Sequence, residues 1–465
     1  MTNDAKAVFD SINNLGATTL TKEIMELYPY QVEDVKALLE RPRCILGSEM
    51  GVGKTAEVLA LTKQEDLAYI LVICPKSLIS EWKYQIEQWL GKEWLDRFII
   101  LNYEKLRKDT VLADIISYGW DLICFDECHK LKNPKAKQTK GATLISRDGA
   151  RVIMMSGTPM MAGPQDLFSL LHIIDPITYK SYNDFRDRYC VTVQLPKPPF
   201  PTIIVGPRKD TQEELSNILS QYMIRRLKKD VLDLPPKMYR TIPVELEPSQ
   251  LAKYKQMEDE LFVLLDSGEK ITAPAITAQI TRLRQICLEP NLLSQIEKVS
   301  SPSTKTLLLL DLIEGIQSPI VVYTVFEKYT RILSDELTKH KISYALFTGM
   351  TSIPDRAQTL RDFQQGKYKV LLGTITTMGL GITLTASHTV IFTDNYWTPA
   401  VNEQAVDRVH RIGQNEIVDV LDMWAKGTIE DHVHKVLARK EKPINEIILR
   451  AQVLESLRSA RRLMQ

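Results

Sequence analysis

Residues 48–55 are Ser48-Glu49-Met50-Gly51-Val52-Gly53-Lys54-Thr55, and they lie between a short apolar run, Cys44–Leu46, and a helix-favouring run. Glycines at such a turn let backbone N–H groups close on phosphate oxygens, and the helix start adds the positive end of its dipole. Lys54 is placed to reach the β and γ phosphates, and the Thr55 hydroxyl to bind Mg²⁺. The stretch predicts a phosphate-binding loop, although Ser48 stands where the strict pattern has glycine.

Two adjacent carboxylates, Asp126 and Glu127, follow a second apolar run, Trp120–Phe125. Carboxylates next to a buried strand are costly unless a cation or a hydrogen-bond network holds them. Ligands bind at the carboxyl ends of the strands in a parallel sheet. Asp126 can then hold the Mg²⁺ of an ATP bound at Lys54, and Glu127 can orient or deprotonate the attacking water. The alternative is a capping box or a solvated turn.

Composition is that of a globular protein, with 44% hydrophobic and 25% charged residues, and a length of 465 residues predicts two to four compact units. No run approaches the roughly 18 apolar residues of a membrane span, and the polar N-terminus lacks the blocks of a secretion signal. The six cysteines form no Cys-x-x-Cys pair, which predicts buried thiols in a reducing compartment and no zinc site. We therefore expect a cytoplasmic protein, in a nucleoid or a virus-infected cell, that is not secreted.

The net charge is +1, from 59 basic and 58 acidic side chains. An overall balance does not exclude nucleic acid, because local basic patches bind phosphates. Two clusters are candidates, and each could equally be a solvated face. They are Lys130, Lys132, Lys135, Lys137 and Lys140, and Arg225, Arg226, Lys228 and Lys229.

Short apolar strands alternate with amphipathic helices in both halves of the chain, which predicts α/β units with parallel sheets covered on both faces. The expected strands are 44–46, 69–74, 97–101, 120–125, 151–155, 320–323, 343–347, 370–372 and 389–392. The expected helices include 78–90, 213–222, 250–265, 275–287 and 352–364. A proline-rich segment, 194–201, predicts a loop or hairpin.

The second half carries no glycine-lysine loop, but it holds two arginines three residues apart, Arg408 and Arg411. On one helical turn both would point the same way. Arginines supplied to an NTPase site can raise the rate about 10³–10⁵-fold. The alternative is a solvated amphipathic helix over 404–414.

Together these motifs resemble the Swi/Snf family of helicase-like, DNA-dependent ATPases in superfamily 2, over about residues 27–448. The first-half segments that carry the resemblance are Tyr28–Gln31, Ser48–Thr55, Val72–Leu78 with Trp82, Asn102–Glu104, Asp126–His129, Ser156–Pro159 and Ile224–Lys237. The second-half segments are Val322–Phe326, Gly379–Ala386, Trp397–Pro399, Asp407–Gln414 and Gly427–Asp431. Ser48 replaces the family's usual acidic residue, Cys128 its usual alanine and Thr383 a common asparagine. Leu283–Cys287 and the proline-rich segment favour the annealing-helicase-like branch.

The resemblance implies two RecA-like lobes with helical insertions, 1–240 and 241–465. The first would hold an insertion at about 165–240, and the second an insertion at about 245–300 and a brace helix at about 428–450. It implies ATP and Mg²⁺ as cofactors, with Gln31 on the adenine edge and Gly51, Val52, Gly53, Lys54 and Thr55 on the phosphates. Asp126, Glu127, Arg408 and Arg411 would complete the catalytic set. Ser156, Thr158 and Gln404 would couple hydrolysis to movement.

The resemblance also implies a monomer that moves along double-stranded or forked DNA without unwinding it, in repair, recombination or replication. The expected DNA contacts are Lys76, Ser77 and Tyr103 in the first lobe and Thr348, Gly349 and Thr376 in the second. Short flanks suggest a compact motor without chromatin-reading modules. The alternatives are a strand-separating DNA or RNA helicase and a DNA-binding scaffold whose ATPase is vestigial.

Overall fold

The computed structural model describes residues 26–147, 149–160, 163–193, 202–266, 273–293, 301–351, 353–379 and 382–438. The chain divides into two compact units, Met1–Asp233 (unit 1) and Leu234–Gln465 (unit 2). The division comes earlier than residue 240, because strand β9 (Lys237–Val244) belongs to the sheet of unit 2. None of the helices within these ranges is both long and apolar enough to cross a membrane.

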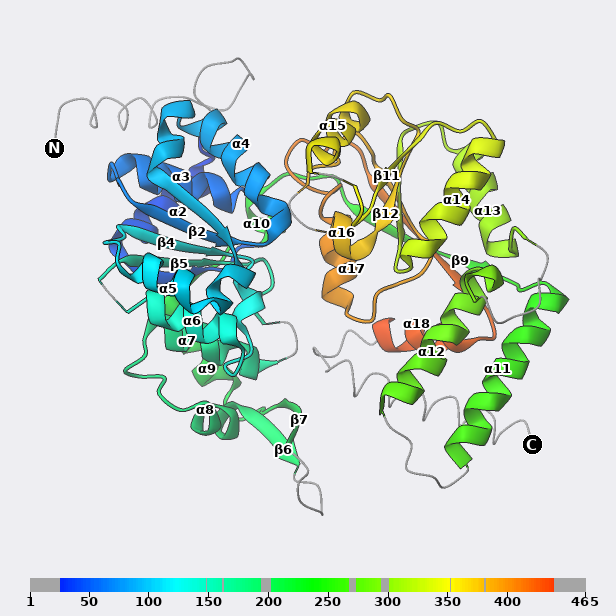
Figure 1. The fold of residues 1–465 in the computed structure, drawn as a ribbon, viewed down its shortest axis with the longest axis horizontal. Helices are drawn as coiled ribbons and strands as arrows, with labels where there is room; N and C mark the ends of the chain where they lie inside the picture. Colours follow the sequence, from blue (N-terminus) through cyan, green and yellow to red (C-terminus); the bar gives the residue numbers. More distant parts are fainter. Residues whose placement is uncertain are drawn as a thin grey trace. The chain divides into compact units, whose positions relative to one another are not determined.

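A parallel sheet of six strands, in the order β3-β2-β4-β5-β1-β8, forms the centre of unit 1 (Figure 1). Its strands are β1 (Arg43–Leu46), β2 (Ile70–Cys74), β3 (Phe98–Asn102), β4 (Leu122–Asp126), β5 (Arg151–Met155) and β8 (Met223–Ile224). Strand residues alternate between two apolar clusters, as Ile123 and Phe125 face one side of the sheet and Leu122 and Cys124 the other. This two-sided burial explains why the strands are continuous apolar runs.

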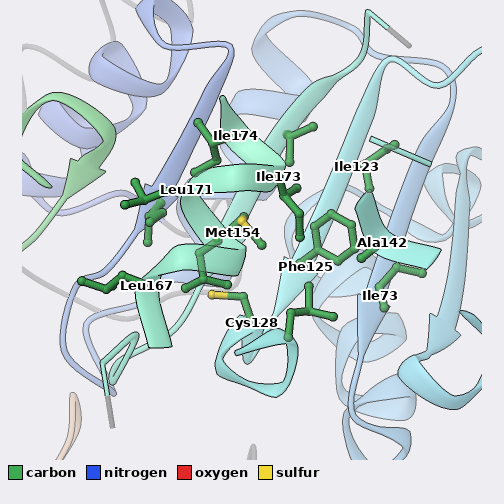
Figure 2. Packing of buried hydrophobic residues seen from close by; sticks show 14 of the residues in the cluster. Ile73, Ile123, Phe125, Cys128, Ala142, Met154, Leu167, Leu171, Ile173 and Ile174 are labelled. Carbon is green, nitrogen blue, oxygen red and sulfur yellow. The ribbon is translucent and has the colours of Figure 1, made fainter. Parts of the chain in front are cut away.

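Helices cover both faces of this sheet. They are α2 (Pro29–Glu40), α3 (Lys54–Gln64), α4 (Ile79–Trp89), α5 (Asp109–Ile116), α6 (Lys137–Ile145), α7 (Leu167–Ile174), α8 (Tyr182–Tyr189), α9 (Gln212–Tyr222) and α10 (Lys228–Val231). Figure 2 shows one of the two cores, where Phe125 of β4 and Met154 of β5 lie near Leu171 of α7 and Ala142 of α6. All six cysteines are buried free thiols, as the sequence predicts for these residues.

A short antiparallel hairpin follows α8. It consists of β6 (Cys190–Val193) and β7 (Ile203–Pro207), with a register shift between Val191 and Thr192. The proline-rich segment 194–201 that was expected to form this loop or hairpin lies outside the described residues, but the two strands that flank it do pair.

Unit 2 has its own six-stranded parallel sheet, in the order β11-β12-β10-β13-β14-β9 (Figure 1). Besides β9, its strands are β10 (Ile320–Thr324), β11 (Tyr344–Phe347), β12 (Val370–Thr374), β13 (Thr389–Phe392) and β14 (Val418–Ala425). Its helices are α11 (Pro248–Asp266), α12 (Ala273–Leu288), α13 (Thr304–Gly315), α14 (Glu327–Lys339), α15 (Ile353–Gln364), α16 (Ile375–Met378), α17 (Pro399–Val406) and α18 (Ile429–Ala438). The expected brace helix is described only as far as Ala438.

The predicted α/β class and the predicted strands are confirmed, and three strands of the two six-stranded sheets were not predicted. Strand β8 has only two residues, and β9 is mostly exposed, so neither has an apolar run. Strand β14 alternates buried and half-buried residues on either side of the buried pair Val420 and Leu421, so its period-two signal in the sequence is interrupted. Arg408 and Arg411 do not lie on one helical turn as expected, and the alternative of an amphipathic helix over 404–414 does not hold either, because α17 ends at Val406 and the chain turns there.

Candidate functional site

The phosphate-binding loop of unit 1 leaves the carboxyl end of β1 and ends where α3 begins at Lys54. Gly51 and Gly53 have φ values of 83° and 86°, in the left-handed region that glycine adopts at no steric cost. A Cβ atom on Gly53 would lie 2.3 Å from Nε2 of Gln31. Both glycines are therefore required by the path of the loop, as the sequence predicts.

Lys54 turns back over this loop. Its Nζ donates hydrogen bonds to the carbonyl oxygens of Ser48, at 2.7 Å, and Glu49, at 2.9 Å. The ammonium group therefore lies at the loop, where it can meet an incoming phosphate. Thr55 is the next residue of the same first helical turn.

Helix α2 braces the loop from the other side. Nε2 of Gln31 donates to the Val52 carbonyl, at 3.1 Å, and the Tyr30 hydroxyl donates to the same oxygen, at 2.8 Å. Oε1 of Gln31 accepts from the N–H of Tyr28, at 2.9 Å. The residue that the family resemblance assigns to adenine thus also holds the phosphate loop in place, a contact that the sequence did not predict.

The segment after β8 fastens the loop to the end of unit 1. Backbone N–H groups of Gly47 and Glu49 donate to the carbonyls of Ile224, at 2.8 Å, and Arg226, at 2.9 Å. The Ser48 hydroxyl accepts from the N–H of Arg226, at 3.1 Å, so serine at this position has a structural role. The Arg226 side chain pairs with the fully buried Asp34, at 2.7 Å. Arg226 is therefore part of the loop's support and not of a solvated basic face.

Glu57 of α3 was not singled out from the sequence. Its side chain is fully buried, and burial followed by the charge of Asp34 raises its pKa to about 8. The signal that could have found it is an acidic residue at a buried position of a helix, and both Asp34 and Glu57 occupy such positions. Burial raises the pKa of both carboxyl groups, and the positive charge of the nearby Arg226 opposes each rise.

Asp126 ends strand β4 with its side chain directed into a hydrogen-bonded corner. Nε1 of Trp82 donates to its Oδ2, at 2.9 Å, and the N–H of Glu127 donates to its Oδ1, at 2.9 Å. Burial, and then the neighbouring Glu127, raise the pKa of Asp126 to about 6, while Lys54 opposes that rise. A carboxylate in this state is one that a cation would stabilise.

Glu127 has φ = 53°, which is unusual for a residue with a side chain. Strain of this kind clusters at functional sites. Its Oε2 lies 3.2 Å from Nδ1 of His129, and the same nitrogen lies 3.2 Å from Oγ of Ser156. Oγ of Ser156 accepts from the N–H of Thr158, at 3.1 Å. A short chain of contacts thus links the predicted water-activating carboxylate to the two residues predicted to couple hydrolysis to movement.

The predicted nucleic-acid contacts of unit 1 have different exposures. Lys76 and Ser77 are exposed directly after the carboxyl end of β2. Tyr103 is only 1% exposed, and its hydroxyl donates to the Asp126 carbonyl, at 2.7 Å. The prediction that Tyr103 touches DNA is therefore not supported, because its ring lies in the apolar core and its hydroxyl supports β4.

The predicted contacts of unit 2 also follow strand ends. Thr348 and Gly349 follow β11, and Thr376 follows β12. Gly349 and Thr376 are exposed, whereas Thr348 is 8% exposed and its hydroxyl accepts from the N–H of Met350. Gln404 is 8% exposed within α17.

Arg408 and Arg411 lie after the end of α17 and contact one short segment of unit 2. Nε of Arg408 donates to the carbonyl of Gly379, at 3.0 Å, and Nη1 of Arg411 to that of Ile382, at 3.1 Å. The turn, and not a helical spacing, brings both guanidinium groups to this segment. The residues between those carbonyls, Leu380 and Gly381, lie outside the described residues.

The side chains of Asp126 and Thr55 offer oxygen atoms, the donor type that suits a magnesium ion. Within the described parts of the chain, no three His, Cys, Asp or Glu side chains gather as a metal-binding group. Mg²⁺ is commonly bound by one or two carboxylates together with substrate phosphates. Asp126 and the Thr55 hydroxyl are oxygen donors of that kind.

Two family models match this chain. A model described as "SNF2-related domain" matches residues 30–102 and 96–292, and one described as "Helicase conserved C-terminal domain" matches residues 304–413. The first therefore spans more than half of the chain.

Three curated relatives have similar sequence identities to this chain. A SWI/SNF-related matrix-associated actin-dependent regulator of chromatin subfamily A-like protein 1 from Xenopus laevis is 27% identical, over 92% of this chain and 44% of its own length. An uncharacterized ATP-dependent helicase of Mycoplasma pneumoniae is 28% identical, over 96% of this chain and 44% of its own. The human DNA annealing helicase and endonuclease ZRANB3 is 27% identical, over 89% of this chain and 40% of its own. The chain thus spans less than half the length of these three relatives.

A solved structure, the Sulfolobus solfataricus SWI2/SNF2 ATPase core in complex with dsDNA, is 26% identical and covers 96% of this chain and 98% of its own, with a TM-score of 0.42. The family models, the order of the motifs and the geometry around Lys54, Asp126 and Glu127 agree. The chain belongs to the SNF2-related family of helicase-like proteins.

Proposed function

We propose that this chain is a motor that couples ATP hydrolysis to movement along double-stranded DNA. The observation that carries the proposal is the contact chain from Glu127 through His129 and Ser156 to Thr158. It joins the carboxylate placed for water activation to a second loop at the same edge of the sheet.

The nucleotide would be held at the loop between β1 and α3. Backbone N–H groups of Gly51, Val52 and Gly53 and the start of α3 suit phosphate oxygens. Lys54 would exchange its contacts with the Ser48 and Glu49 carbonyls for phosphate oxygens. Gln31 keeps acceptor capacity at Oε1 for the adenine amino group, because a carboxamide oxygen can accept two hydrogen bonds.

Mg²⁺, when bound, would neutralise charge on the β and γ phosphates. Asp126 and Thr55 would hold it through their side-chain oxygens. Glu127 would orient the attacking water and accept its proton, with His129 fixing the carboxylate at 3.2 Å. We assign Arg408 and Arg411 to the charge that develops on the leaving phosphates, and Gln404 to coupling.

The DNA contacts of this proposal are the exposed residues at strand ends, Lys76, Ser77, Gly349 and Thr376, with Thr348 supporting the second pair. Contacts of this kind go to the sugar-phosphate backbone and carry little sequence information. Duplex affinity should therefore fall steeply as salt rises. An affinity that is insensitive to salt would argue against phosphate contacts.

The experiment that tests the proposal measures ATP turnover in parallel without nucleic acid and with single-stranded DNA, duplex DNA, forked DNA and RNA. A strand-displacement assay accompanies it on the same substrates. The proposal expects stimulation by duplex or forked DNA without strand separation. Strand separation would make the chain a helicase, stimulation by RNA alone an RNA motor, and no turnover at all a binding scaffold.

A further inference from the structure

Two neighbouring hollows on unit 1 lie outside the nucleotide site. One, of about 300 Å³, is lined by residues of α6, α7 and the start of α8, and the other, of about 390 Å³, by residues of α8 and the hairpin strand β7. Pro134 and Tyr182 line both hollows, so the two adjoin. We call the two hollows, with the residues that line them, the basic groove.

The charge of the groove has one sign. Lys140, Arg147 and Lys180 line the first hollow, and Lys135 and Arg186 line the second. Arg186 pairs with Asp187, at 2.7 Å, so we discount its charge. Among the described residues that line the two hollows, none carries a carboxylate. A concave surface of this kind attracts a polyanion.

Other side chains of the first hollow are hydroxyl groups and rings. The hydroxyls of Thr139, Thr143 and Ser169 donate to backbone carbonyls. Phe168 is buried and stacked on His172, so the half-buried Tyr182, whose ring centroid lies 5.4 Å from that of Phe168, is the aromatic side chain of this lining that a ligand can reach. A basic groove with an aromatic platform is the usual arrangement for single-stranded nucleic acid, because a base can stack where its phosphate is bound. A duplex is too wide to enter a hollow of a few hundred cubic ångströms.

We propose that the basic groove binds a single-stranded segment of nucleic acid, apart from the exposed strand-end residues assigned to the duplex. The inference rests on the proposed function for its nucleic-acid partner. It gives a role to part of the lysine cluster 130–140, whose two interpretations the sequence left open.

The groove also adjoins the loop that leaves Glu127. Carbonyls of Lys130, Leu131 and Lys132 accept hydrogen bonds from the side chains of Gln138, Thr139 and Ser169 respectively. Thr139 and Ser169 line the first hollow themselves. A strand in the groove would therefore press on the residues that hold this loop, so we expect single strands to alter turnover.

The test measures fluorescence anisotropy of a labelled 20-residue thymidine oligonucleotide with the full chain. The variant is Lys140→Gln/Lys180→Gln, and the control Lys63→Gln/Lys92→Gln removes the same charge from exposed lysines elsewhere on unit 1. We expect the groove variant to bind about tenfold more weakly and the control to bind like the wild type. The slope of log affinity against log salt should fall by about 1.4 in the groove variant, since each phosphate contact on a single strand contributes about 0.7.

Equal single-strand affinity in the wild type and the groove variant would overturn the proposal. So would an equal loss of duplex and single-strand affinity, which would place the duplex itself in the groove. A loss confined to an acidic peptide, tested with polyglutamate, would make the groove a peptide site instead.

Cross-linking provides a second measurement that does not depend on a change of charge. A bromouracil-substituted single strand should form a cross-link at Tyr182, located by mass spectrometry, and Tyr182→Leu should abolish it. Cross-links confined to Lys76 or Ser77 would contradict the groove. Duplex-stimulated turnover of the wild type is measured alongside, because its absence would count against the proposed motor and not against the groove.

Discussion

Asp126 of unit 1 and Asp394 of unit 2 occupy similar places, at or just after the carboxyl end of a central parallel strand, and Asp126 is half-buried whereas Asp394 is buried. Asp126 accepts hydrogen bonds from Trp82 Nε1 and the Glu127 N–H, both at 2.9 Å. Asp394 Oδ1 accepts from Thr324 Oγ1, at 2.8 Å, Val325 N–H, at 3.1 Å, and Thr393 Oγ1, at 3.0 Å. Its Oδ2 also faces the buried Arg284 guanidinium, at 3.5 Å.

The difference shows how one fold serves two purposes. The charge of Asp394 is balanced within the protein by Arg284. The Cζ atom of Arg284 also lies 4.8 Å from the ring centroid of Trp397, and these two contacts fix α12 to the carboxyl edge of the sheet. Asp126 accepts from two donors and has the acidic Glu127 beside it, so we propose that its negative charge is met by an external cation. We infer that the number of donors around such a carboxylate, more than its place in the sheet, distinguishes the proposed catalytic aspartate from the structural one.

The largest expected effect concerns Glu127, the neighbour of Asp126 in unit 1. Glu127→Gln should lower ATP turnover by about 10²–10⁴-fold, because it removes the proton acceptor for water. The melting temperature should change little. Turnover at the wild-type rate would place Glu127 with the structural carboxylates, and Glu40→Gln, at an exposed position, is the control.

The next largest effect concerns Asp394 of unit 2. Asp394→Ala should lower the free energy of unfolding by about 3 kcal/mol, because it leaves the Arg284 charge buried without its partner. ATP affinity, measured by titration calorimetry, should be kept. Asp335→Ala, at an exposed position of the same unit, should leave stability unchanged, and an equally small effect of Asp394→Ala would refute the structural role.

A smaller effect sharpens the role of the contact chain in unit 1. Ser156→Ala removes the oxygen that meets His129 and the Thr158 N–H. We expect a loss of about tenfold in DNA-stimulated turnover, as for about 1.4 kcal/mol of lost interaction, with nucleotide affinity unchanged. A parallel loss of nucleotide affinity would assign Ser156 to binding and not to coupling.

The effect that is smallest per unit change concerns pH and separates two titrating groups of unit 2. Burial raises the pKa of Asp422 to about 7 and lowers that of His434 to about 4, and their side chains lie 3.3 Å apart. Between these values folded Asp422 keeps a proton that the unfolded chain loses, so its contribution to stability falls as pH rises from about 4 to 7. Folded His434 lacks a proton that the unfolded chain holds, so its contribution rises from pH 4 to about 6.5.

The two slopes oppose each other in the wild type. Asp422→Asn should leave stability rising between pH 4.5 and 6.5, and His434→Gln should leave it falling, each by about 1 kcal/mol per pH unit. Denaturant unfolding at several pH values measures both. Identical pH profiles in the two variants would show that neither group is perturbed by burial.

The sequence predicted the fold well where burial repeats along a strand. Runs such as Ile70–Cys74 and Ile320–Thr324 are buried at every position, so their apolar composition is a direct record of the sheet. Strand β9 could not be found this way, because it pairs with β14 through its backbone while most of its side chains face solvent.

The site was predictable where chemistry demands a residue type at a fixed spacing, as at Lys54 and Asp126. Support from distant residues was not predictable. The partners of Ser48 and Glu49 lie near residue 226, and only the folded chain shows that pairing. Tyr103 shows the opposite failure, because a family motif gave it an exposed role that its burial contradicts.

The hydrogen bonds from Gly47 and Glu49 to Ile224 and Arg226 also determine when the glycine loop can be completed during synthesis of the chain. The ribosome makes the glycine loop early, yet the loop gains its last supports only after nearly all of unit 1 has emerged. Nascent chains released before Ile224 should therefore retain nucleotide weakly, however well their first strands have formed. Tight ATP binding by a nascent chain would then indicate that the whole of unit 1 has been synthesised.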